Sequence, residues 1–98
     1  MKKESDYQAK LKQKILERLP GAMVLKNDPS GIRGIPDLTV LYKDRWAALE
    51  TKREEEEAGK RKNQRYYVSK MNEMSFARFI FPENEEDVLN EMEQALKL

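Results

Sequence analysis

The chain has 98 residues, which suffices for one domain with a single modest core. Charged residues make up 38% of it, which places it at the polar end of globular proteins, and it contains neither cysteine nor histidine. This composition excludes disulfides, thiolate- or histidine-bound zinc and a histidine general base, so any metal must be held by oxygen atoms. No apolar run approaches the roughly 18 to 20 residues that cross a bilayer, and the lysine-rich start lacks the apolar segment of a signal peptide, so we expect a soluble intracellular protein.

The first half of the chain reads as a helix, a strand and a hairpin. From about Ser5 to Leu19 apolar residues recur at four-residue steps, which predicts an amphipathic helix, and Ser5 with Gln8 has the spacing of a capping box. Pro20 and Gly21 end this helix, residues 22–26 form a short strand, and residues 27–34 have the Gly, Pro and Asn content of a loop. Residues 38–42 and 46–51 are the strands of a hairpin whose turn lies within residues 43–45.

The second half adds a helix, a strand and a last helix. Residues 54–62 are a charged connector, and from about Asn63 to Met74 a helix presents one inward face: Gln64, Tyr67, Val68, Met71 and Met74. Residues 76–81 form an apolar strand, after which Asn84 is an N-cap for the C-terminal helix. The order is α-β-β-β-α-β-α, which predicts one α/β domain over residues 1–98 with a mixed sheet flanked by helices.

The net charge of +1 hides a polarised distribution. An acid-free stretch carries a row of basic residues, while the C-terminus is acidic: Lys60, Arg61, Lys62, Arg65 and Lys70 against Glu83, Glu85, Glu86, Asp87, Glu91 and Glu93. A basic face can meet nucleic-acid phosphates. The alternative is a pair of solvated helix surfaces, because charged residues are mostly exposed.

Three charges mark the hairpin, with Asp37 before the first strand and Glu50 and Lys52 at the end of the second. Glu50 and Lys52 share a face because side chains alternate along a strand. A two-residue turn at Lys43-Asp44 places Asp37 opposite Glu50, and a turn at Asp44-Arg45 places it opposite Lys52; both registers put all three charges on one face. A three-residue turn breaks this arrangement unless a bulge restores it.

Two opposed carboxylates repel each other unless a cation lies between them. Their Cβ atoms are about 4.5 to 5.5 Å apart, a gap that suits a Mg²⁺ ion bound by oxygen at about 2.1 Å. Lys52 beside such an ion can orient or help deprotonate a water, which makes a phosphodiester-hydrolysing site without histidine. The alternative is an ordinary cross-strand salt bridge from Asp37 to Lys52 with Glu50 partly solvated.

These residues resemble a known nuclease family. The stretch GIPD at residues 34–37, the thirteen positions from Asp37 to Glu50, ETK at residues 50–52 and NQRYY at residues 63–67 are similar to the virus-type replication-repair nuclease domain of the PD-(D/E)xK superfamily. The resemblance covers nearly the whole chain and implies a restriction-endonuclease-like fold. It also implies a DNA endonuclease dependent on Mg²⁺ or Mn²⁺ and acting in DNA repair, on branched DNA such as four-way (Holliday) junctions. Further implications are a homodimer, no small-molecule cofactor, and the cytoplasm of a bacterial or phage-infected cell.

The resemblance also implies roles for single residues. Asp37 and Glu50 match the metal-binding carboxylates, with the backbone carbonyl of Thr51 as a further ligand, and Lys52 matches the catalytic lysine. Gln64 matches a helical glutamine that borders the active site, the alternative being a surface glutamine.

Glu4 matches an acidic residue of the first helix that completes the metal shell. Its rival is Asp6, because an N-cap at Ser5 leaves Glu4 just outside the helix.

The expected DNA contacts are Arg33, in the loop before the hairpin, and the basic stretch of Lys60, Arg61, Lys62 and Arg65. The acidic run Glu54–Glu57 departs from this pattern because acids near a DNA groove repel phosphates, so we expect it to point away or to gate access. The competing function is a non-catalytic nucleic-acid-binding or assembly module with the same fold.

Overall fold

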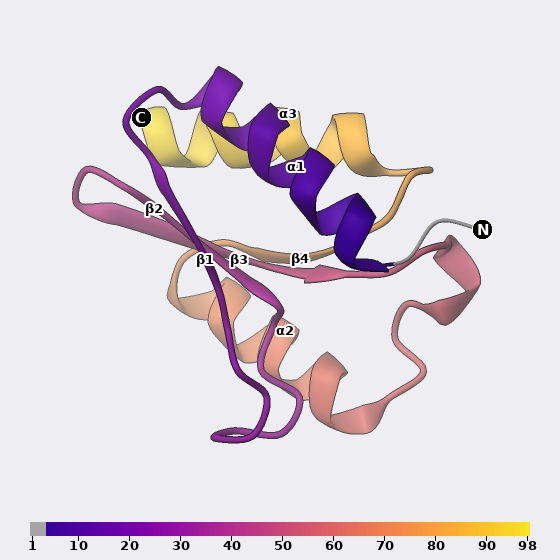
Figure 1. The fold of residues 1–98 in the computed structure, drawn as a ribbon. Coiled ribbons are helices and arrows are strands. Elements are labelled where there is room, and N and C mark those ends of the chain that lie inside the picture. Colours follow the sequence, from indigo (N-terminus) through magenta and orange to yellow (C-terminus); the bar gives the residue numbers. More distant parts are fainter. Residues whose placement is uncertain (1–3) are drawn as a thin grey trace.

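The computed structural model describes residues 4–98 as a four-stranded mixed sheet with helices on both faces (Figure 1). The strands lie in the order β1 (Met23–Lys26), β2 (Leu38–Tyr42), β3 (Arg45–Thr51) and β4 (Ala77–Ile80). The first two pairings are antiparallel, whereas β3 and β4 are parallel and are connected through helix α2 (Lys62–Met74). The element order α-β-β-β-α-β-α predicted from the sequence is confirmed.

The main core lies between the sheet and two helices, α1 (Glu4–Arg18) and α3 (Glu85–Lys97), which cover one face (Figure 1). Their apolar stripes pack on alternate residues of β2 and β3: the fully buried members include Leu11, Ile15, Val40, Ala47, Leu49 and Met92. The intervening residues of β3 face α2, where Ala48 and Trp46 pack with Val68 in a smaller cluster. Because side chains alternate along β3, neighbouring residues of this strand reach opposite layers.

The hairpin adopts the first of the two predicted registers. Leu38 pairs with Leu49 and Tyr42 with Arg45, so the turn is Lys43-Asp44 and the register extends to place Asp37 opposite Glu50. Lys43 takes φ 57°, the left-handed region that a two-residue hairpin turn demands and that non-glycine residues enter at some cost. The pairing, rather than the turn residues, therefore sets the register, since a one-residue slip would move the buried Leu38 and Val40 of β2 to the wrong face.

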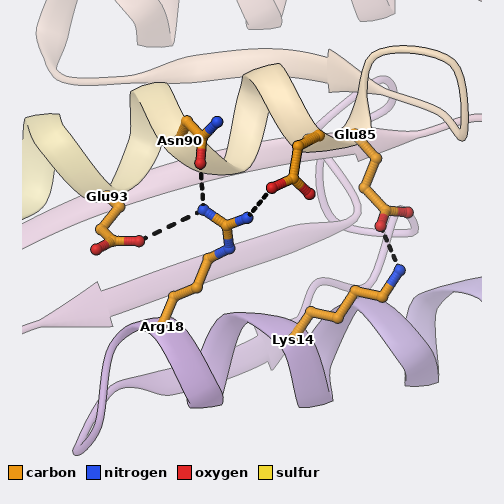
Figure 2. Close-up of polar contacts among 6 residues, drawn as sticks. Lys14, Arg18, Glu85, Asn90 and Glu93 are labelled. Carbon is orange, nitrogen blue, oxygen red and sulfur yellow. Dashed lines mark hydrogen bonds and ion pairs between the residues drawn. The ribbon is translucent and has the colours of Figure 1, made fainter.

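Helix α1 is fastened to α3 by polar side chains (Figure 2). The Arg18 guanidinium lies 2.5 Å from Asn90 Oδ1, 2.7 Å from Glu86 Oε1 and 3.4 Å from Glu93 Oε1, and Lys14 pairs with Glu85. Single exposed ion pairs contribute about 0 to 1 kcal/mol each, but here they add to the apolar packing of the same two helices. The direction of α1 is thereby fixed, and its first turns are directed to the end of β3.

Three details differ from the sequence predictions. The described part of α1 includes Glu4, so Ser5 lies inside the helix and is not its N-cap. Met74, predicted on the inward face of α2, is 67% exposed. The charged connector contains a short 3₁₀ helix, η1 (Glu55–Glu57). Among residues 4–98, none of the helices has the length and apolar character that a membrane crossing requires.

Candidate active site

A cavity of about 460 Å³ opens where β3 ends and the chain leaves the sheet. Its walls come from both helical layers and from the hairpin: Glu4, Asp37, Glu50, Lys52, Arg53, Glu57, Arg61 and Gln64. The structure therefore brings together Glu4 of α1, Gln64 of α2 and the three hairpin charges that the sequence singled out. Side chains from the helices on both faces of the sheet meet here, because β3 ends and no further strand residue lies between them.

Glu50 is the most deeply buried charged group at this cavity, with 2% of its surface exposed. Its Oε2 lies 3.6 Å from Lys52 Nζ, whereas Oε1 is buried with no hydrogen-bond partner. Burial, and next the charge of Asp37, raise the pKa of Glu50 to about 8, while Lys52 opposes the rise. One lysine is thus insufficient to keep Glu50 ionised at neutral pH.

Lys52 does not make the salt bridge of the alternative interpretation. That interpretation pairs Lys52 with Asp37 and leaves Glu50 partly solvated, but the structure pairs Lys52 with Glu50 and buries the latter. An ordinary surface salt bridge is therefore not what the hairpin charges form.

Asp37 is held at one carboxylate oxygen. Its Oδ2 accepts hydrogen bonds from the Thr51 backbone N–H at 2.9 Å and from the Thr51 hydroxyl at 2.7 Å. The backbone around it is fixed by Asn27, whose N–H donates to the Asp37 carbonyl at 2.7 Å and whose side-chain amide donates to the Pro36 carbonyl at 2.9 Å. Sequence reasoning missed Asn27, because an asparagine in a loop carries no local sign of the residue it will contact.

Glu4 and not Asp6 belongs to the cavity. Glu4 lines it, and Glu4 Oε1 lies 3.2 Å from the Thr51 hydroxyl oxygen. Asp6 lines a separate hollow along α1 together with Ala9. Helical geometry explains the difference, since two residues along a helix correspond to a rotation of about 200°.

Gln8, which sequence analysis treated only as a capping-box partner, donates through Nε2 to the Thr51 hydroxyl at 2.8 Å. It lies one helical turn beyond Glu4, so both residues face the end of β3. That i, i+4 spacing was the available signal, but it acquires meaning only when the end of β3 is known to lie beneath α1.

Helix α2 and the acidic run supply the remaining wall. Gln64 lines the cavity from the first turn of α2, and its Oε1 is buried without a hydrogen-bond partner, so it is not a plain surface glutamine. The acidic run divides: residues 54–56 are exposed, as expected of residues that point away, but Glu57 lines the cavity 3.5 Å from Arg53 Nε. Glu57 was not singled out from the sequence because its neighbours in the run are indistinguishable from it.

A larger cavity of about 870 Å³ adjoins the first and shares Asp37, Arg61 and Gln64 with it. Three of the predicted DNA contacts, Arg33, Arg61 and Lys62, line it. The other two do not, since Lys60 is exposed outside both cavities and Arg65 lines a shallow hollow along α2.

The floor of this larger cavity depends on Gly34. Gly34 has φ 88°, and a Cβ there would lie 2.6 Å from Asn63 Cβ and 2.8 Å from the Asn63 carbonyl carbon. Only glycine lets the loop carrying Arg33 pack this closely against the start of α2. Helix α2 also begins without a side-chain cap, so its positive end adds to the basic character of the cavity.

The donor atoms suit a divalent cation, although among residues 4–98 no three acidic side chains already form a complete metal-binding group. Asp37, Glu50 and Glu4 supply carboxylate oxygens to one cavity, and Glu50 Oε1 is buried without a partner. Hard cations such as Mg²⁺ and Mn²⁺ prefer such oxygen ligands. A bound cation would satisfy Glu50 Oε1 and relieve the repulsion between Asp37 and Glu50.

Comparison of the chain with protein-family models, with curated proteins and with solved structures finds no match. Any functional assignment therefore depends on the residues of the cavity and on the resemblance of the hairpin sequence.

Proposed function

We propose that this protein is a metal-dependent DNA endonuclease in which Asp37, Glu50 and Glu4 hold Mg²⁺ or Mn²⁺. The observation that supports this most is Glu50, a carboxylate 2% exposed with an unpartnered oxygen, placed beside Asp37 and Lys52. A buried polar atom without a hydrogen-bond partner is destabilising unless it serves a bound ligand. Perturbed pKa values also cluster at functional sites.

The side chains around the cavity have distinct roles in the proposed hydrolysis. A bound divalent cation supplies a Lewis acid that stabilises negative charge on phosphoryl oxygens. Lys52, held by Glu50, presents its ammonium group to the cavity, where it orients the attacking water and balances charge on the phosphate. Gln64 lines the same cavity with an unpartnered amide oxygen, and it positions the water or a phosphate oxygen. The Thr51 carbonyl as a further ligand stays a prediction.

The DNA path in this proposal runs over the larger cavity. Arg33, Arg61 and Lys62 line it beside Asp37, so a backbone phosphate bound there is adjacent to the proposed catalytic residues. Preference for branched DNA and a homodimeric assembly follow from the resemblance alone and stay predictions. Two symmetric cuts in a four-way junction would require a closed twofold pair of such sites.

Two variants test the proposal. Asp37→Asn removes a charged ligand and should weaken Mn²⁺ binding strongly and abolish cleavage, whereas Lys52→Met leaves the carboxylates, removes a nearby positive charge and should bind Mn²⁺ as well or better while cleavage is lost. Calorimetric titration of Mn²⁺ and cleavage of duplex, flap, single-strand and four-way junction DNA measure the two effects. Asp44→Asn, at the exposed hairpin turn, is the matched control.

Unaltered Mn²⁺ affinity in Asp37→Asn would show that the carboxylates are not metal ligands. Metal binding and DNA binding without cleavage of any of the four substrates would favour the non-catalytic module instead.

A further inference from the structure

A chain of hydrogen bonds runs from α1 through the end of β3 to Asp37. Gln8 Nε2 donates to Thr51 Oγ1 at 2.8 Å, and Thr51 Oγ1 donates to Asp37 Oδ2 at 2.7 Å. The Thr51 backbone N–H donates to the same Oδ2 at 2.9 Å, and Thr51 is fully buried. Asp37 is thus oriented by a residue of the opposite face of β3, which is in turn oriented by a helix.

The single proton of the Thr51 hydroxyl decides which carboxylate is held. Asp37 Oδ2 lies 2.7 Å from Oγ1 and Glu4 Oε1 lies 3.2 Å from it, but a hydroxyl donates to only one of them at a time. Because Gln8 donates to Oγ1, the hydroxyl proton is directed to an acceptor, and the shorter contact is that with Asp37. Asp37 is therefore fixed, whereas Glu4 is left to turn toward another partner.

We propose that Gln8 and Thr51 are positioning residues that occupy Oδ2 of Asp37 and leave Oδ1 to bind the divalent cation. This inference rests on the proposed function, because it assigns a role toward the same cation. Groups that hydrogen-bond a metal-binding carboxylate fix its orientation, and their loss typically costs about 10- to 100-fold in metal affinity. One-oxygen binding also keeps coordination positions open for water and substrate, as Mg²⁺ chemistry requires.

A role in folding alone explains the arrangement less well. Gln8 Oε1 is buried with no hydrogen-bond partner, so the amide is not part of a fully satisfied network. An apolar pair of similar shape at positions 8 and 51 would fill the same space without an orphaned acceptor. The polar pair of Gln8 and Thr51 instead directs the hydroxyl proton of Thr51 to Asp37.

The first test compares Thr51→Val and Thr51→Ser in the full chain. Valine keeps the β-branched shape but removes the hydroxyl, so the Mn²⁺ affinity measured by calorimetry should fall about 10- to 100-fold. Serine keeps the hydroxyl and should retain an affinity within about threefold of the wild type. Thermal melts with a chelator report the stability of each metal-free variant separately.

The second test uses Gln8→Glu, for which simple electrostatics predicts a higher Mn²⁺ affinity and the positioning role predicts a lower one. A carboxylate at position 8 cannot donate to Thr51 and takes the hydroxyl proton away from Asp37, so Mn²⁺ affinity should fall about tenfold or more although a negative charge has been added near the cation. Gln13→Glu adds the same charge at an exposed position of α1 and should leave the affinity unchanged.

The outcomes separate the two levels of the proposal. A wild-type protein that binds no Mn²⁺ overturns the proposed function, and the positioning role with it. A wild type that binds Mn²⁺, with affinity lost in Asp37→Asn but kept in Thr51→Val, refutes the positioning role and leaves the metal site in place. A lowered melting temperature with unchanged affinity in Thr51→Val likewise refutes it, because that result is the mark of a purely structural hydroxyl.

Discussion

Glu50→Gln should remove a pH dependence from the stability of the metal-free protein. In the folded chain burial and Asp37 raise the pKa of Glu50 to about 8, whereas in the unfolded chain its ordinary value is 4.5. Between these two values the folded state binds one more proton than the unfolded state. The stability that this proton provides is therefore complete below the unfolded pKa and is lost as the pH rises through the folded pKa. Glutamine is neutral at every pH and keeps the shape of the side chain.

The expected size follows from one-proton linkage. Where the folded state holds one extra proton, the free energy of unfolding falls by about 1.4 kcal/mol for each pH unit. From about pH 5 to pH 8 the loss is then up to about 4 kcal/mol, a large part of the 5 to 15 kcal/mol typical of a domain.

The other groups with shifted pKa values are shifted away from this window. The chain has no histidine, and Asp28 and Glu93 have pKa values lowered by hydrogen bonds to Ser30 and Lys97, so they titrate below it. Glu50 is thus the group expected to set the slope.

Urea unfolding at a series of pH values, with a chelator present, measures the effect. Trp46 is the single tryptophan and packs in the smaller core cluster, so its fluorescence reports unfolding. Saturating Mn²⁺ should then stabilise the wild type at pH 8 by about 2.7 kcal/mol at one hundred times the dissociation constant and leave Glu50→Gln unaffected. Glu56→Gln, exposed on η1, should keep the wild-type slope. A wild type whose stability is flat from about pH 5 to pH 8, or a Glu50→Gln variant with the same slope, would refute the reasoning.

Two further predictions concern Gly34 and the basic stretch that begins at Lys60. Gly34→Ala should destabilise the protein by about 1 to 3 kcal/mol, since it combines a positive φ with a Cβ too close to Asn63, and urea unfolding checks this against Gly31→Ala, where a Cβ meets nothing within 4 Å. Neutralising Lys60, Arg61 and Lys62 together should weaken DNA binding and reduce the slope of its logarithm against log salt by about 0.9 for each phosphate that the protein no longer neutralises, while Mn²⁺ affinity does not fall. Fluorescence anisotropy over a salt series measures that slope, and an unchanged slope would mean that these residues are merely solvated.

The secondary structure was largely predictable because its signals are local. Four-residue apolar steps, the proline and glycine stops, and the alternating hairpin strands give the element order without any tertiary contact. The helix ends are less predictable, because they depend on what the neighbouring layer covers. The predicted N-cap at Ser5 is wrong, and Met74, predicted to face inward, is exposed. The 3₁₀ helix η1 (Glu55–Glu57) was not predicted, because a run of glutamates has no hydrophobic period.

Part of the candidate site was also fixed by local pattern. Asp37, Glu50 and Lys52 lie on paired strands, so strand alternation and two possible turn registers already place them together. Glu4 and Gln64 could be proposed only by resemblance, since each lies on a separate helix whose direction no local pattern gives.

What only the tertiary structure decided is which groups meet at the end of β3. Glu4 rather than Asp6 lines the cavity, and Lys52 pairs with Glu50 rather than with Asp37. Glu57 also lines the cavity, and Gln8 donates a hydrogen bond to Thr51 beside it. These outcomes depend on how α1 and α2 pack across the two faces of the sheet, which is set by the summed burial of many apolar side chains and not by the polar residues themselves. The sequence by itself determined the chemical types available, carboxylates and lysine without histidine or cysteine, because composition limits chemistry before any fold forms. The distances between the site residues, the burial of Glu50 and its raised pKa arise only when the helices on both faces of the sheet have packed against β3.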